Sequence, residues 1–99
     1  MKAYRQGDVI LIRVTKRPED AKRLKHLVLA EGEVTGHSHR VAGDGAALLE
    51  AAGGRRFLDV REESILVHEE HGPVTLPPGL FEVKIQREYD PERDRIVRD

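Results

Sequence analysis

The sequence predicts an all-β fold, a small antiparallel barrel, roll or sandwich of about seven or eight short strands. Short segments rich in β-branched and other apolar residues recur along the chain at a spacing of about ten residues. Glycine and proline turns separate these segments. No long segment has the 3.6-residue periodicity of an amphipathic helix.

In the first half of the chain, the strongest strand segment is DVILIRV at residues 8–14. Its run of apolar residues predicts a strand buried on both faces. A charged stretch follows, and one helical turn is expected at residues 19–24, because Pro18 suits the start of a helix. Further strands are predicted where apolar character returns, at residues 26–30 and 37–41.

In the second half, residues 46–52 contain alanine and leucine but lie between Gly-Asp-Gly and Gly-Gly, so a hairpin strand is favoured over a helix. Residues 80–89 alternate most clearly, with Phe81, Val83 and Ile85 on one face, which predicts a strand with one buried face. Shorter strands are predicted at residues 55–60, 64–68 and 74–76.

The chain has 99 residues, which predicts a single β domain over residues 1–99. Residues 90–99 form a charged C-terminal tail in this interpretation, with Ile96 and Val97 as a last short strand. Because 38% of residues are hydrophobic and 35% are charged, the core is modest. A small core with several sheet edges favours a homo-oligomer, most simply a dimer.

The charge balance limits the function classes. Seventeen basic and eighteen acidic residues give a net charge of −1, which argues against a dedicated nucleic-acid binder but leaves room for a local basic patch. The absence of cysteine excludes disulfides, thiolate nucleophiles and iron–sulfur clusters. No apolar run approaches the roughly 20 residues of a membrane helix. We therefore expect a cytoplasmic protein without a membrane partner.

Two histidine pairs are the main chemical feature of the sequence. His-Ser-His at residues 37–39 would place both imidazoles on one face of a strand. His-Glu-Glu-His at residues 68–71 precedes a Gly-Pro turn that could bring it to the same place. Imidazole and carboxylate together suit zinc, iron(II), manganese or nickel. The predicted metal ligands are His37, His39, His68, His71 and Glu70, with Glu69 as the alternative carboxylate.

Other interpretations of these residues stay open. The histidines could form a pH-sensitive surface or subunit contact without metal, or the two pairs could be unrelated in space. His26 opens a strand and suggests a structural role. Arg55 and Arg56, with Arg61 nearby, indicate either a small anion patch or a solvated turn. A zinc-protease motif is excluded, because only one residue separates Glu69 from the second histidine.

Part of the chain resembles the cupin β-barrels. Residues 32–39 supply a glycine and an H-x-H like the first cupin motif, and residues 77–79 supply the P-x-G of the second. The resemblance implies a barrel with a histidine-ligated metal. Glu82 and Gln86 stand where the second cupin motif has a histidine and an asparagine.

As a whole, the chain is similar to a group of short bacterial and phage proteins of unassigned function. The shared segments are QGDV at 6–9, GEVTGHSH at 32–39, HEEH at 68–71, LPPG at 76–79 and QREY at 86–89. This similarity implies no mechanism.

Two functions follow as hypotheses. The first is a small metal-binding β protein; if it is an enzyme, the metal would activate water or bind a small oxygen-rich ligand. The second is a non-catalytic β module that acts through homodimerisation or a protein partner. The metal hypothesis needs the nitrogens of both histidine pairs near one point. The module hypothesis predicts scattered histidines and a flat apolar patch.

Overall fold

The fold was analysed in a computed structural model, which describes residues 3–31 and 36–86. Within these residues it contains ten strands and one 3-10 turn. The N-terminal strands are β1 (Ala3–Gln6), β2 (Val9–Val14), β3 (Lys22–Arg23), β4 (Val28–Glu31) and β5 (Ser38–Ala42). The remaining elements are β6 (Ala46–Glu50), the turn η1 (Ala52–Gly54), β7 (Arg56–Val60), β8 (Ser64–Val67), β9 (Val74–Leu76) and β10 (Gly79–Ile85).

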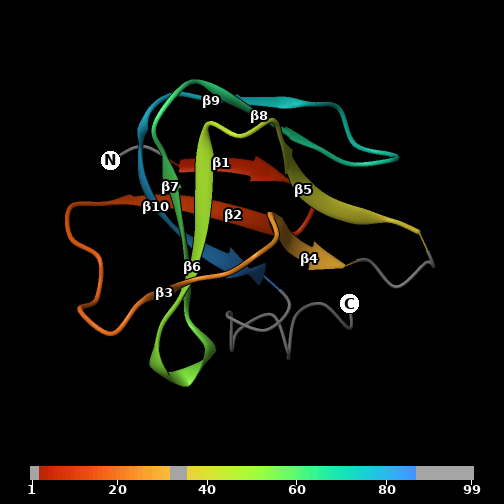
Figure 1. The fold of residues 1–99 in the computed structure, drawn as a ribbon. Coiled ribbons are helices and arrows are strands. Elements are labelled where there is room, and N and C mark those ends of the chain that lie inside the picture. The colour runs from red at the N-terminus through yellow and green to blue at the C-terminus, as the bar shows by residue number, and fades with distance from the viewer. Residues whose placement is uncertain (1–2, 32–35, 87–99) are drawn as a thin grey trace.

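The strands form two antiparallel sheets (Figure 1). The larger sheet has six strands in the order β1-β2-β10-β7-β6-β3, and the smaller has four in the order β4-β5-β8-β9. Neither order returns to its first strand, so the sheets stay open and the fold is a sandwich. The prediction of an all-β antiparallel fold is confirmed, and the structure has more strands than the seven or eight expected from the sequence.

The core lies between the two sheets and takes side chains from both. Val9 and Leu11 of β2 and Phe81 of β10 are fully buried and pack with Leu66 and Leu76 of the smaller sheet. The alternating exposure of β2 and β8 follows from this arrangement, because successive strand residues point to opposite faces. β2 was predicted to be buried on both faces; Ile10 and Ile12, on its second face, are only half-buried.

Two predicted details differ from the structure. The helical turn expected at residues 19–24 is wrong. Ala21 donates its backbone N–H to the Pro18 carbonyl at 3.1 Å, which closes one tight turn, and β3 then pairs with β6. Pairing with a buried neighbour outweighs the weak helical preference of this charged stretch. Strand β1, at the start of the larger sheet, was not predicted, because its sequence, AYRQ, has little apolar alternation.

The C-terminal tail at residues 90–99, with its expected short strand, lies outside the described residues. So do residues 87–89 of the predicted last strand. In the part of the chain that the structure describes, no helix has the length and apolar character to cross a membrane.

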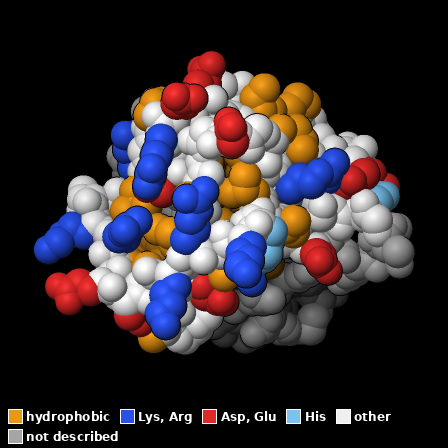
Figure 2. Space-filling view, viewed as in Figure 1, with side chains coloured by type: hydrophobic (Ala, Val, Ile, Leu, Met, Phe, Trp, Pro, Cys, Tyr) orange, Lys and Arg blue, Asp and Glu red, His pale blue; other side chains and the backbone are white. Residues whose placement is uncertain are grey.

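One face of the molecule is rich in basic side chains. Figure 2 shows lysine and arginine side chains spread over the face that β3 and β6 turn toward the viewer, with apolar side chains between them. Lys22 and Arg23 of β3 are both exposed. Basic residues therefore gather locally although the whole chain carries a net charge of only −1.

Candidate functional site

The β1–β2 hairpin forms one wall of the candidate site. Gln6 pairs with Val9 across a two-residue turn made by Gly7 and Asp8. Gly7 has a φ of 61°, which a two-residue hairpin turn requires of its first residue and which glycine adopts without steric cost. A Cβ built on Gly7 would lie 2.7 Å from Nε2 of His71 and 3.2 Å from Cε1 of His39. The turn is therefore packed directly against two of the predicted ligands.

The structure brings the rings of His37, His39, His68 and His71 side by side. The ring centroids of His39 and His68 are 4.3 Å apart, and those of His68 and His71 are 4.7 Å apart. His37 lies 5.7 Å from His68, and His39 lies 5.8 Å from His71. The four rings come from the start of β5 and from the segment that follows β8. They meet because β5 and β8 are hydrogen-bonded neighbours.

His39 is buried, and Gln6 holds it in one orientation. The Gln6 amide nitrogen donates to the carbonyls of Leu66 at 3.0 Å and Gly72 at 2.9 Å. Its amide oxygen must then face the ring, 2.9 Å from Nδ1 of His39. Nδ1 therefore carries the proton and donates it to Gln6, and in the neutral ring Nε2 keeps a lone pair. The shared segment QGDV includes Gln6, but nothing in the sequence indicated its contact with His39, because a buried glutamine at a strand end shows no periodicity.

Nε2 of His39 faces a carboxylate. It lies 3.6 Å from Oδ1 of Asp8, the second residue of the hairpin turn. Burial, and after it the neighbouring His68 ring, lower the pKa of His39 below its ordinary value of 6.5, while Asp8 acts in the opposite direction. The ring is therefore neutral at pH 7, and a nitrogen lone pair and a carboxylate oxygen point toward each other.

His68 has a different role in this geometry. Its Nδ1 accepts the backbone N–H groups of Glu70 at 3.0 Å and His71 at 3.3 Å. The side chain thereby folds residues 68–71 into a turn and aims His71 at Gly7. Since Nδ1 is an acceptor, the neutral ring carries its proton on Nε2, and His68 presents no lone pair outward in this conformation.

The two carboxylates of the 68–71 segment differ in their contacts. Glu69 accepts the backbone N–H of Ser38 at 2.9 Å and forms an ion pair with Arg40 at 2.8 Å. These contacts, led by the Ser38 N–H, lower the pKa of Glu69. Glu70 is largely exposed, and its carboxylate lies 3.7 Å from Nδ1 of His37. Glu69 therefore ties the segment to β5, while Glu70 faces the outer part of the site.

Among the residues that the structure describes, no three His, Asp or Glu side chains are placed to hold a metal ion simultaneously. The predicted ligands are close neighbours, but their ring nitrogens do not point toward one common position. Nδ1 of His26 accepts the Val28 backbone N–H at 3.1 Å, in keeping with a structural role. Glu82, at the cupin-like position, forms ion pairs with Arg55 and Lys84.

The flat apolar patch that a docking module would need has little support on the described surface. Ile65 of β8, 44% exposed, is the large hydrophobic side chain that stands out there. One isoleucine does not make a patch, because single exposed apolar side chains are normal on protein surfaces.

Comparison with known proteins gives a family but no activity. No curated protein matches the chain, and no solved structure matches it. A family described as Domain of unknown function (DUF8820) matches residues 5–86, which include the hairpin turn and all four histidines of the site. The chain belongs to this family.

Proposed function

We propose that this protein binds one divalent transition-metal ion at the tip of the β1–β2 hairpin, with His39, His71 and Asp8 as ligands. The observation that carries the proposal is the orientation of His39. Gln6 fixes its tautomer, so Nε2 presents a lone pair to the Asp8 carboxylate 3.6 Å away. Two electron-rich atoms that face each other in a partly buried site are a favourable place for a cation.

In this proposal, Gln6 is the hydrogen-bond partner that orients a metal-binding histidine without contacting the metal itself. Metal-binding histidines generally donate their second ring N–H to a fixed acceptor, which sets the tautomer and the ring orientation. Here that acceptor is the Gln6 amide oxygen, which is itself fixed by two backbone carbonyls. The fold itself thus already orients one ligand.

The other two ligands would have to move to bind. His71 is exposed, and the side chain of Asp8 is 36% exposed, so both can rotate without disturbing the core. Nε2 of His71 and Cε1 of His39 both lie close to the position that a Cβ on Gly7 would occupy. Rotation of two surface side chains toward one buried, fixed imidazole is a small change, which supports this ligand set over one that includes His68.

Two histidines with one carboxylate suit zinc, iron(II), manganese or nickel. Three protein ligands leave a coordination position for water or a small oxygen-rich ligand. His37 and Glu70, 3.7 Å apart at the outer side, would border that position.

Two glycine-to-alanine variants, one at the site and one as a control, test the proposed metal site. Gly7→Ala places a methyl group against His71 and His39 at a residue with positive φ. Gly43→Ala introduces a similar backbone strain, since Gly43 has a φ of 89°, but nothing lies within 4 Å of its new Cβ. Metal content of tag-free protein and zinc titration calorimetry are measured for the parent and both variants.

We expect about one equivalent of metal in the parent and in Gly43→Ala, with strongly weakened binding in Gly7→Ala. If the parent takes up no zinc, iron(II), manganese or nickel, the proposal is wrong. Equal binding by both glycine variants would place the metal elsewhere. A folded His37→Ala/His39→Ala double variant that still binds metal with parental affinity would exclude His39 as a ligand and overturn the proposal.

A further inference from the structure

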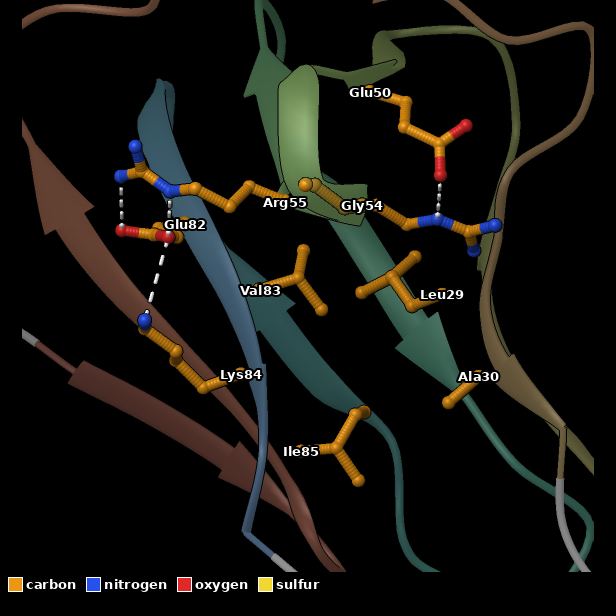
Figure 3. A pocket seen from close by; sticks show the side chains of 11 residues that line it. Leu29, Ala30, Glu50, Gly54, Arg55, Glu82, Val83, Lys84 and Ile85 are labelled. Carbon is orange, nitrogen blue, oxygen red and sulfur yellow. Dashed lines mark hydrogen bonds and ion pairs between the residues drawn. The ribbon is translucent and has the colours of Figure 1, made fainter. Parts of the chain in front are cut away.

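A groove opens where β7 begins, on the part of the fold bounded by β4 and β10 (Figure 3). Its volume is about 550 Å³. Arg56, the first residue of β7, pairs with Val83, so β10 runs beyond the end of its neighbour from this point. The groove has an apolar floor, formed by core-facing residues of β4 and β10: Leu29, Ala30, Val83 and Ile85.

Charged side chains surround this floor. Arg55, Arg56 and Lys84 contribute three positive charges to the lining, and Glu50 and Glu82 contribute two negative ones. The lining sums to one net positive charge, which lies in the Arg55–Glu82–Lys84 cluster, whereas Arg56 is balanced by Glu50. A groove with an apolar floor and this net charge is complementary to a ligand with an apolar body and a single negative charge.

The guanidinium of Arg55 already has two partners within the protein. Arg55 binds both oxygens of Glu82, at 3.0 and 3.3 Å, and lies over the ring of Phe57. Lys84 approaches the same carboxylate at 3.4 Å, as Figure 3 shows. Glu82 is buried beneath these two cations, although the alternation of β10 had placed it on a solvated face.

Arg56 is held far more loosely. Its Nε lies 3.6 Å from Glu50, and its Nη1 lies 3.5 Å from the Val28 carbonyl, both at the long limit for such contacts. Arg56 also lines a second hollow of about 280 Å³ along β4, with His26, Val28 and Glu31. It therefore stands between two hollows with guanidinium donors available for a stronger acceptor.

An added β-strand is a poor fit for this groove, although β4 is an edge strand. His26 accepts the N–H of Val28, and Arg56 donates to its carbonyl, so side chains already cover both backbone groups of this residue. The register of β4 also shifts between Val28 and Ala30. Short, irregular and side-chain-covered edges are those that resist strand addition. The occupant must therefore be held by side chains.

We propose that this groove binds aliphatic monocarboxylates, with the carboxylate on Arg56 and the chain on Leu29, Val83 and Ile85. The Arg56 fork can exchange its long contact with Glu50 for a close pair with the ligand carboxylate. The hydrocarbon chain covers Val83 and Ile85, which the sandwich leaves half-buried, and extends toward the buried Leu29. This inference does not depend on the metal site.

Methyl and amide NMR of the full chain tests the proposal, with sodium octanoate as the probe at fixed pH. We expect saturable shifts at Leu29, Val83 and Ile85 with a Kd on the order of 1 mM, as suits a ligand of this size. Each methylene removed should weaken binding about fourfold, and acetate should not bind measurably. Octylammonium, with the same chain and the opposite charge, should bind much more weakly.

Three variants locate the carboxylate. Arg56→Gln should weaken octanoate binding about tenfold or more, because it removes a charge-assisted hydrogen bond. Arg61→Gln, at an exposed arginine outside the groove, should leave binding unchanged. Glu50→Gln should strengthen binding, because it releases Arg56 and removes a like charge.

No shift with octanoate, or equal binding of octylammonium, overturns the proposal. Equal affinity for acetate and octanoate would leave a simple anion contact and would also overturn it. Shifts of the same methyl groups on dilution of the protein alone would assign the groove to a second copy of the chain instead. The octanoate titration is repeated with Gly7→Ala, where unchanged affinity separates this site from the proposed metal site.

Discussion

The amide oxygen of Gln6 lies 2.9 Å from Nδ1 of His39, although 33 positions separate the two residues in the chain. Both side chains are almost completely buried. The contact joins the first strand of the larger sheet to the second strand of the smaller one. A polar bond across the sandwich thus sets the direction in which the imidazole presents its second nitrogen.

The first prediction concerns this bond. Gln6→Leu should lower zinc affinity about 10- to 100-fold, because the His39 tautomer is no longer fixed. It should also lower the free energy of unfolding by about 1–3 kcal/mol, since the buried Leu66 carbonyl loses a donor. Calorimetry and urea unfolding measure the two effects separately.

Ser64→Ala provides the control for Gln6→Leu. Ser64 is buried and donates to the Glu62 carbonyl at 2.7 Å, outside the histidine site. This variant should lose stability but keep its zinc affinity. If both variants bind zinc equally well, Gln6 does not orient a ligand.

The second prediction is that zinc stabilises the fold through Asp8. At a free zinc concentration about 100 times the Kd, the parent should gain about 2.7 kcal/mol in its free energy of unfolding. Asp8→Asn, which keeps the size of the turn residue, should lose most of this gain, and a chelator should abolish it in the parent. Thermal unfolding with and without zinc provides the measurement. An undiminished gain in Asp8→Asn would remove Asp8 from the ligand set.

The third prediction concerns acid stability. Hydrogen bonding to Arg55 is the largest cause that holds the pKa of Glu82 below its ordinary value of 4.5, and Lys84 adds to the effect. A carboxyl with a lowered pKa stabilises the fold above its unfolded value, and this stabilisation is lost as pH falls through the folded value. Stability should therefore decline below about pH 4.5 in the parent.

Urea unfolding from pH 6 to pH 3 tests this effect. Glu82→Gln should be less stable than the parent near pH 6, and the difference should shrink as the pH falls. Glu63→Gln, at an exposed position just before β8, should follow the parent at every pH. A constant difference between Glu82→Gln and the parent would show that protonation of Glu82 is not involved.

The fourth prediction uses two neighbouring residues of β8. Leu66 is fully buried between the sheets, whereas Ile65 on the opposite face is 44% exposed. Leu66→Ala should cost about 2–5 kcal/mol of unfolding free energy, and Ile65→Ala about 1 kcal/mol or less. Similar losses at both positions, measured by urea unfolding, would contradict the sandwich geometry.

Strand positions could largely be predicted from the sequence, because apolar runs and turn residues are local features. The predicted strand at residues 74–76 coincides with β9, and the strand predicted at residues 46–52 is present as β6 over Ala46–Glu50, with Ala52 already in the turn η1. Which strands pair with each other could not be predicted. Strand β1 is held by its register with β2 rather than by apolar alternation of its own.

The residue types of the candidate site could be predicted from the sequence, but the role of each residue could not. The spacing of the histidines indicated that rings could share a face, and the structure places four rings together. The direction of each lone pair depends on partners far away in the chain, such as Gln6 for His39. Local patterns contain no information on such partners, which is why Gln6 and Asp8 were not among the predicted ligands and His68 was.

The close approach of Gly7 to His71 also has an evolutionary consequence. Nε2 of His71 lies 2.7 Å from where a Cβ at position 7 would be, so a side chain there would displace the His71 ring from its place beside the turn. The two positions, 64 residues apart, should therefore not vary independently among members of the family. Members that keep histidine at the position of residue 71 should keep glycine at that of residue 7, and a larger residue in the turn should coincide with a smaller one at the other position.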